Sequence, residues 1–248
     1  MKILGIIPAR YASSRFPAKP LADIGGKPMI QRVYEQAKKS KLLTDVVVAT
    51  DHREILDCVT EFGGHAVLTS EKHESGTDRC AEVAANWKEP VDYVVNIQGD
   101  EPFISPDQID LLATLFDGKV ELATLIKKIE DHSQLVNPHV VKVLVSATHY
   151  GIYFSRTPLP YQRSNPTEWL KTHTYFKHIG MYGYKADVLQ TITNLPISKL
   201  EKAESLEQLR WIENGYSILT AETEIECVSI DTPEDLERAR NSLSKQHG

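Results

Sequence analysis

The sequence predicts an α/β protein with a mostly parallel sheet and helices on both of its faces. Short apolar segments rich in Val and Ile alternate with segments of helical periodicity through roughly the first 117 residues. These apolar segments are continuous, which is typical of parallel strands buried on both faces. Of the 248 residues, 41 % are hydrophobic and 25 % are charged, so a mainly disordered, collagenous or coiled-coil chain is excluded.

The first half of the chain contains four predicted strand–helix pairs. The fourth helix has the clearest start, because Ser105 can cap it, Pro106 takes its first position and Gln108 completes a capping box. The strands are expected at residues 3–7, 45–50, 66–68 and 92–97, and helical periodicity covers 29–37, 55–62, 80–87 and the residues from 105 onward.

The pattern changes after that fourth helix. A proline-rich, aromatic stretch at 157–169 is expected to be irregular. Thr232 and Pro233 open the last helix, as its N-cap and its first residue. Further strands are expected at residues 121–127, 139–145, 151–154, 179–184 and 227–230, and one helix over 200–213.

Composition also limits the class of protein. The three cysteines are scattered, so neither a disulfide framework nor a CxxC site is available, and a reducing cytoplasm is expected. No apolar run approaches the roughly 18 residues that span a bilayer, and the apolar residues 1–8 are too few for a signal peptide. The net charge of −6 argues weakly against nucleic acid as a partner. Neither membrane insertion nor nucleic-acid binding is expected.

The loop after the first strand is the most informative segment. Arg10, Arg15 and Lys19 lie there, with hydroxyls such as that of Ser14 between them. Open α/β sheets place their ligand crevice at the carboxyl ends of the strands. Arginine grips phosphate oxygens with two bonds and lysine adds a point charge, so this loop suits a polyphosphate. An exposed basic loop is the alternative. The sequence has neither GxGxxG nor a Walker A motif.

Two acidic residues are candidate metal ligands. Asp100 follows the fourth predicted strand, beside Gly99 and Glu101, and Asp231 follows the predicted strand at 227–230. Both can therefore lie at the carboxyl edge of the sheet. Mg²⁺ needs only one or two carboxylates in addition to phosphate oxygens, so this pair suits it. An acidic turn before a helix is the alternative.

The start of the third predicted helix is a further candidate. Ser75, Gly76, Thr77 and Arg79 offer hydroxyls, backbone N–H groups and a guanidinium to a nucleotide, with helix capping as an equal alternative. His173 and His178 are five residues apart, which is not the spacing of a helical zinc pair, so neither histidine is assigned to a metal.

Motifs along the whole chain resemble one enzyme family. The segments PARYASSRFPAKPL, HESGTDR, NIQGDEP, NPHVVKV, YFSR, HIGMYGY, LEQLR and IDTPEDLERA occur in the order of the 3-deoxy-manno-octulosonate cytidylyltransferases, also called CMP-KDO synthetases. The resemblance runs from residue 3 to about residue 240, and HIGMYGY with LEQLR narrows it to this family. Ala18 stands where the family usually has glycine, and Lys185 where arginine is common.

The resemblance implies a Rossmann-like nucleotidyltransferase fold with an inserted dimerisation region, in a cytoplasmic homodimer. It divides the chain into a nucleotide-binding core, about residues 1–128 and 215–248, and an insertion at about 129–214 that binds sugar and forms the dimer. The implied reaction joins CTP to the acidic sugar 3-deoxy-manno-octulosonate (KDO), releases pyrophosphate, requires Mg²⁺ and serves lipopolysaccharide biosynthesis. A cytidylyltransferase for sialic acid or for an amino-substituted octulosonate stays open, as does a non-catalytic nucleotide-binding module.

The resemblance also assigns roles residue by residue. Arg15, Lys19 and Asp100 are implied to be catalytic, and Asp100 and Asp231 to bind the metal. Nucleotide binding is implied for Pro8, Ala9, Arg10, Ser14, Arg15, Lys19, Ser75, Gly76, Thr77, Arg79 and Gln98. Sugar binding is implied for Arg163, His178, Tyr182, Glu207 and Gln208, although a packing role is favoured for Tyr182.

Overall fold

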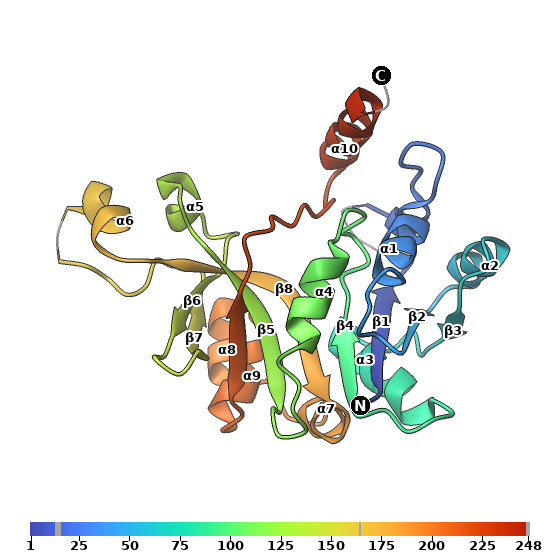
Figure 1. Cartoon of the computed structure of the whole chain (residues 1–248), viewed down its shortest axis with the longest axis horizontal. Helices are drawn as coiled ribbons and strands as arrows, with labels where there is room; N and C mark the ends of the chain where they lie inside the picture. The colour runs from blue at the N-terminus through green and yellow to red at the C-terminus, as the bar shows by residue number, and fades with distance from the viewer. Residues whose placement is uncertain (13–15, 164, 247–248) are drawn as a thin grey trace. The chain divides into compact units, whose positions relative to one another are not determined.

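The computed structural model describes residues 1–12, 16–163 and 165–246. The chain forms two compact units (Figure 1). The first unit comprises residues 1–113 and 227–248, and the second comprises residues 114–226. The sequence-based division, at 128/129 and 214/215, concerns the roles of the segments and stays a prediction.

The first unit contains a parallel sheet in the strand order β3-β2-β1-β4. All of its strand pairs are parallel, which confirms the expectation for this half of the chain. The central strands are almost wholly buried because both of their faces are covered. The strands are β1 (Ile3–Ala9), β2 (Asp45–Thr50), β3 (Ala66–Leu68) and β4 (Tyr93–Asn96).

Amphipathic helices pack on this sheet. In α1 (Met29–Ala37), Met29, Ile30 and Val33 are fully buried, and α1 and α3 both contact β1. The last helix joins the same core, since Leu236 and Ala239 pack in a cluster with Met29. The other helices of the unit are η1 (Lys19–Leu21), α2 (Arg53–Glu61), α3 (Gly76–Asn86), α4 (Pro106–Ala113) and α10 (Pro233–Gln246).

The sheet of the second unit is mixed and closes on itself. Its order is β8-β5-β9-β7-β6, and β6 also pairs with β8, so the sheet returns to its first strand. Only β5 and β9 run parallel, while the other pairs are antiparallel. The strands are β5 (Leu122–Lys128), β6 (Lys142–Val145), β7 (Tyr150–Ser155), β8 (Phe176–Lys185) and β9 (Ile218–Glu222).

Short helices connect these strands. Trp169 and Tyr175 pack in one hydrophobic cluster with Ile129 and Leu135. Of these four residues, only Trp169 belongs to the stretch 157–169 that the sequence marks as irregular. The helices are α5 (His132–Val136), η2 (Pro166–Glu168), α6 (Trp169–Thr172), α7 (Ala186–Ile192), α8 (Lys199–Glu204) and α9 (Gln208–Glu213).

Two element predictions are wrong. Residues 227–230 form no strand, and the strand in this part of the chain is β9 at Ile218–Glu222. The helix expected over 200–213 is two helices, α8 and α9. They are separated because Ser205 adopts a left-handed conformation with φ of 52°, which an α-helix cannot continue through.

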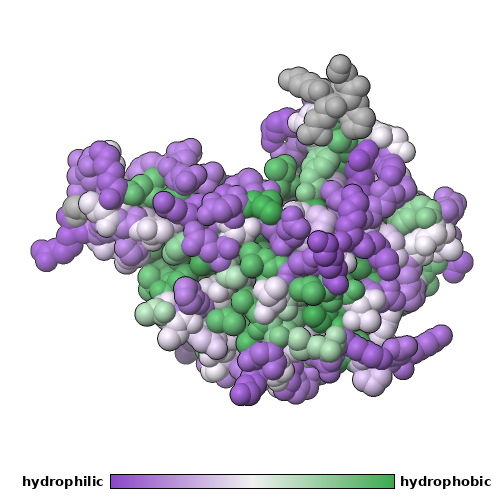
Figure 2. Space-filling model, viewed as in Figure 1, coloured by the Kyte–Doolittle hydropathy of each residue, from purple (hydrophilic) through white to green (hydrophobic). Residues whose placement is uncertain are grey.

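No helix among the described residues is long and apolar enough to cross a membrane. The face drawn in Figure 2 mixes hydrophilic residues with hydrophobic areas.

Candidate active site

Three predicted site residues of the first unit come together. Lys19 Nζ lies 2.8 Å from an oxygen of Asp100 and 3.4 Å from an oxygen of Asp231. The lysine side chain is 15 % exposed and the two aspartates are 27 % and 45 % exposed, so the cluster opens toward solvent on its carboxylate side. A single cation is thus held between two carboxylates that are 131 positions apart in the chain.

Backbone contacts explain this convergence. The Ile230 N–H donates to the carbonyl of Asp100 at 2.9 Å, which fixes the segment before Asp231 without any strand. A Cβ on Gly99 would lie 2.7 Å from the carbonyl oxygen of Pro8, so only glycine lets the segment that carries Asp100 approach the end of β1. The group that approaches Gly99 most closely is thus a backbone carbonyl. The phosphate loop, residues 10–19, follows β1 directly.

Glu101 is a feature of the site that the sequence did not single out. Its side chain is buried, at 7 % exposure. Burial, together with the neighbouring charges of Asp100 and Asp231, raises the pKa of Glu101 to about 7. The motif QGDEP shows two adjacent acidic residues, but only the fold reveals which of them is buried.

The phosphate loop is fastened at its first turn. The Tyr11 N–H donates to Asp51 at 3.2 Å, and the Tyr11 ring stacks on His52 with ring centroids 3.8 Å apart. The Ala18 N–H donates to the Tyr11 carbonyl at 3.0 Å. Ala18 has φ of 55°, in the left-handed region that favours glycine.

The predicted nucleotide-binding residues around the end of β1 differ in their exposure. Arg10 is exposed, Pro8 is half-buried, and Ala9 is buried as the last residue of β1. Ser14 and Arg15 lie outside the described residues.

The start of α3 combines capping with packing. Ser75 forms a capping box with Asp78, as the structural alternative predicted. Thr77 and Arg79 are buried, at 3 % and 2 % exposure, and the Arg79 guanidinium donates to Asp51 at 2.9 Å and to Thr69. Arg79 therefore supports the residue that fastens the phosphate loop, and its direct contact with a nucleotide stays a prediction.

Two further predicted nucleotide residues lie close to this edge. Gly76 lies against the Pro8 ring, because a Cβ added to Gly76 would be 3.4 Å from that ring. Gln98 is half-buried after β4, and its carbonyl accepts from the Glu101 N–H at 3.3 Å.

In the second unit, an irregularity in β8 shapes the predicted sugar site. Along β5, Thr124 faces Tyr182 but the next residue, Leu125, faces Ile179, so β8 carries inserted residues between them. The rings of His178 and Tyr182 lie 5.0 Å apart. Burial lowers the pKa of His178 to about 3, so its ring is neutral at pH 7.

Tyr182 has the environment of a ligand contact. Its hydroxyl is buried and has no hydrogen-bond partner among the described residues. A buried hydroxyl without a partner costs free energy, and a bound ligand could supply the missing hydrogen bond. Burial, with the neighbouring Tyr184 and Glu207, raises the pKa of Tyr182 well above its usual value. Glu207 is half-buried and precedes α9, whose first residue, Gln208, is buried.

Arg163 is not joined to this group. It is exposed in the segment that precedes η2, and no ion pair or hydrogen bond ties it to His178 or Tyr182 in the part of the chain that the structure describes.

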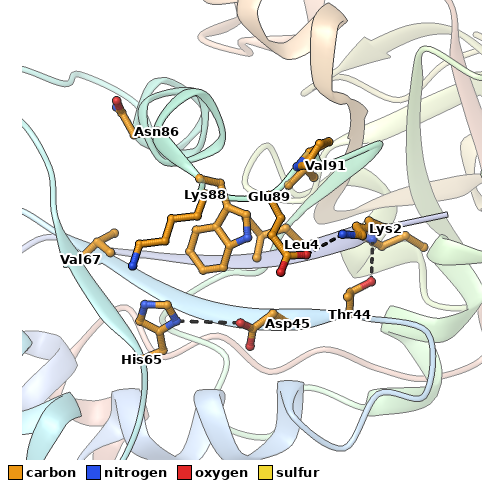
Figure 3. Close-up of a pocket in the computed structure, with 13 residues that line it drawn as sticks. Lys2, Leu4, Thr44, Asp45, His65, Val67, Asn86, Lys88, Glu89 and Val91 are labelled. Atoms are coloured by element: carbon orange, nitrogen blue, oxygen red, sulfur yellow. Dashed lines mark hydrogen bonds and ion pairs between the residues drawn. The ribbon is translucent and has the colours of Figure 1, made fainter.

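A cavity of about 420 Å³ lies at the other edge of the first unit's sheet (Figure 3). It is lined by residues at the amino ends of the strands, including Leu4, Asp45 and His65. The charged groups there are largely paired with one another, as Lys2 is with Glu89. Ligand crevices of open α/β sheets lie at the carboxyl edge, so the Lys19 cluster is the better candidate.

Comparisons with known proteins identify the relatives of this chain. A family model described as cytidylyltransferase matches residues 4–238. A 3-deoxy-manno-octulosonate cytidylyltransferase of Cytophaga hutchinsonii is 56 % identical over 246 residues, with 98 % of each chain covered. One of Parabacteroides distasonis is 55 % identical, over 99 % of this chain and 100 % of its own. A solved structure of CMP:2-keto-3-deoxy-manno-octonic acid synthetase complexed with CTP superposes with a TM-score of 0.92 at 42 % identity, covering 99 % of this chain and 100 % of that one.

Proposed function

The chain belongs to the 3-deoxy-manno-octulosonate cytidylyltransferase family, and from that membership we propose how its residues carry out the reaction. The enzyme transfers the cytidylyl group of CTP to KDO and releases pyrophosphate. The observation that carries the assignment of roles is the convergence of Lys19, Asp100 and Asp231 at the carboxyl edge of the parallel sheet.

The phosphate loop is assigned to the triphosphate. Arg10 and Lys19 supply fixed positive charge at the end of β1, and Arg15 is assigned the same role from the sequence. Tyr11 is held by Asp51, which Arg79 supports in turn, and this fixes where the loop leaves the sheet, so that Arg10 is positioned before the nucleotide binds.

Asp100 and Asp231 are assigned to Mg²⁺, and the residues present fit this ion. A cation, the Lys19 ammonium, already lies between the two carboxylates, and both present hard oxygen ligands. No group of three or more His, Cys, Asp or Glu side chains suited to a metal occurs among the described residues, but Mg²⁺ bound with phosphates needs only one or two carboxylates. When bound, the ion supplies charge neutralisation at the α-phosphate and lowers the pKa of a coordinated hydroxyl.

The protein's own contribution is positioning and charge. The anomeric hydroxyl of KDO attacks the α-phosphorus in line, and the bond to pyrophosphate breaks. Such displacements need no covalent protein nucleophile. Lys19 is placed to stabilise the negative charge that grows on the leaving pyrophosphate, because its ammonium lies beside Asp100 at the carboxyl edge of the sheet.

The sugar is assigned to the group on β8 and α9. The unpartnered hydroxyl of Tyr182 and the neutral ring of His178 offer hydrogen bonds to sugar hydroxyls, and Glu207 and Gln208 extend the polar surface. Arg163 is assigned to the sugar carboxylate from the sequence, because arginine matches a planar carboxylate with two bonds.

The setting of the enzyme is proposed on similar grounds. KDO activation serves lipopolysaccharide assembly, and a cytoplasmic location fits Cys58, Cys80 and Cys227, which form no disulfide in the described part of the chain. A homodimer through the second unit is supported by Tyr150 and Ile152, which are 38 % and 51 % exposed. The two residues are two positions apart in β7 and so lie on the same face of the strand. Figure 2 shows a hydrophobic area where Figure 1 draws β6 and β7.

The test is pyrophosphate release with CTP, Mg²⁺ and a panel of acidic sugars. KDO is expected to give the highest kcat/KM, with sialic acid and an amino-substituted octulosonate well below it. Omitting Mg²⁺ should abolish release with every sugar. A higher kcat/KM with one of the other sugars would overturn KDO as the substrate, and undiminished release in the presence of a chelator would overturn the metal assignment.

A further inference from the structure

Thr124 is a buried polar residue that the reaction as described does not use. It lies in the middle of β5, faces Tyr182 in the strand register and is 0 % exposed. Its hydroxyl oxygen lies 2.9 Å from His178 Nε2, 2.8 Å from the carbonyl oxygen of Met181 and 3.2 Å from that of Ile179. One hydroxyl thus meets both the histidine and the irregular backbone of β8.

These contacts determine the direction of each hydrogen bond. A threonine hydroxyl has one proton, and a carbonyl oxygen can only accept. An oxygen–oxygen distance of 2.8 Å needs a proton between the atoms, so the hydroxyl donates to the carbonyl of Met181. The hydroxyl must then accept from His178, which requires the proton on Nε2. Because the ring is neutral, Nδ1 carries no proton and remains a hydrogen-bond acceptor.

The same contacts hold the bulge that brings the two sugar-site rings together. Residues four apart in a regular strand are separated by about 13 Å along it. His178 and Tyr182 have that spacing, yet their ring centroids lie 5.0 Å apart. The inserted residues between Ile179 and Tyr182 bend the strand, and the Thr124 hydroxyl lies near the carbonyl oxygens on both sides of Gly180, with the shorter contact to Met181.

We propose that Thr124 is a positioning residue for sugar binding, which sets the tautomer of His178 and holds the β8 bulge so that His178 and Tyr182 meet one substrate. His178 then accepts a hydrogen bond from a sugar hydroxyl through Nδ1 and does not donate one to the sugar carboxylate. The proposal rests on the assignment of His178 and Tyr182 to the sugar site.

The chain offers a matched control for a buried threonine. Thr220 lies directly opposite Thr124 on β9, is 3 % exposed, and donates its hydroxyl to the carbonyl of His149 at 2.7 Å. Its replacement by valine removes from the same sheet a buried hydroxyl whose hydrogen bond goes to His149 and not to a sugar-site ring.

The spectroscopic part of the experiment determines the tautomer of His178 in the wild-type protein. In ¹⁵N-histidine-labelled protein, with the resonance assigned through His178→Gln, the wild-type ring is expected to be the neutral Nε2–H tautomer at pH 7. Thr124→Val should shift the ring toward a tautomer mixture, and Thr220→Val should leave it unchanged. An Nδ1–H tautomer in the wild type would overturn the proposal, whether or not Thr124→Val folds.

The kinetic part separates positioning from general stability. Thr124→Val is expected to raise the KM for KDO about tenfold or more, because the His178 ring and the Met181 carbonyl lose their hydrogen-bond partner. The KM for CTP should stay within about twofold. Thr124→Ser should restore most of the KDO affinity, and Thr220→Val should keep both KM values. An unchanged KDO KM in Thr124→Val, with large effects in His178→Gln and Tyr182→Phe, overturns the positioning role alone. Unchanged kinetics in those two variants overturn the sugar site itself.

Discussion

At the scale of single residues, the Lys19 ammonium can form ion pairs either with the carboxylates of Asp100 and Asp231 or with the phosphates of CTP. Without a nucleotide its ammonium neutralises Asp100 and Asp231. A lysine held there competes with a divalent ion for the same oxygens. The site therefore carries its own counterion, and each carboxylate is stabilised before a metal arrives.

Lys19→Met is thus expected to strengthen Mg²⁺ binding in the absence of CTP while turnover falls. Isothermal titration of the nucleotide-free protein with Mg²⁺ measures the first effect, and pyrophosphate release measures the second. Lys27→Met is the control, because Lys27 pairs with Glu35 on an exposed surface and should change neither. Weaker Mg²⁺ binding in Lys19→Met would contradict the competition.

The carboxylates themselves give a sharper test of the metal assignment. Asp100→Asn and Asp231→Asn are each expected to reduce turnover by at least about 100-fold, which corresponds to about 2.7 kcal/mol of transition-state stabilisation. Circular dichroism should show an unchanged fold. A near-normal rate at saturating Mg²⁺ in both variants would rule out a shared metal site.

Ala18 stores backbone strain at the end of the phosphate loop. Its φ of 55° costs a non-glycine residue about 1 kcal/mol, and glycine avoids this cost. Ala18→Gly is expected to stabilise the protein by up to that amount and to raise Tm by about 2–4 °C. Ala22→Gly, at an ordinary φ of −60°, should lower Tm instead. Differential scanning calorimetry compares the two, and a lower Tm in Ala18→Gly would show that the loop is not strained.

His178 makes the folded protein sensitive to acid. Its pKa is about 3 in the folded protein and near 6.5 when unfolded, so between these values only the unfolded chain takes up the proton. Stability is therefore lost as pH falls below about 6.5, by up to about 1.4 kcal/mol for each pH unit. His178→Gln should reduce the slope of unfolding free energy between pH 6.5 and 4. Urea unfolding at several pH values checks this, and an equal slope would contradict it.

At the scale of elements, α8 and α9 are joined by one charged pair. Arg210 donates to both carboxylate oxygens of Glu201, at 2.7 and 2.6 Å, and both side chains are 12 % exposed. Glu201 also completes the capping box of α8 with Ser198. The arginine of the LEQLR motif is therefore structural, while the neighbouring Glu207 and Gln208 are assigned to substrate.

Arg210→Met leaves the Glu201 carboxylate without its partner and is expected to destabilise the protein by about 3 kcal/mol. Arg210→Lys keeps the charge, loses the two-pronged contact and should cost less. Urea unfolding measures both. Arg53→Met is the control, since its pair with Asp57 is exposed and should contribute little. Equal effects in Arg53→Met and Arg210→Met would show that the pair does not hold the two helices.

At the scale of the whole molecule, the second unit carries the surface proposed for dimerisation. Ile152→Asp should convert the dimer to a monomer, because a charge replaces apolar contact area at the interface. Ile197 is equally exposed, at 51 %, but lies between α7 and α8, so Ile197→Asp should leave a dimer. Sedimentation velocity distinguishes the two, and a wild-type monomer at micromolar concentration would contradict the homodimer.

The sequence by itself determined much of the first unit. Continuous apolar strands such as residues 45–50 are buried on both faces, which is typical of a parallel sheet, and a parallel sheet places all carboxyl ends at one edge. That rule was enough to expect Asp100 near the phosphate loop. The motif resemblance determined the family, which the relatives confirm.

Only the tertiary structure decided the remaining features, because they depend on contacts between distant segments. Asp231 reaches Lys19 through a backbone bond between Ile230 and Asp100, and the strand expected before it does not exist. Glu101 is buried while the Asp100 side chain is partly exposed, although the two residues are adjacent and chemically alike. The β8 bulge is fixed by a hydroxyl on another strand, 57 positions away from the carbonyl it bonds, and no local pattern in HIGMYGY encodes that partner.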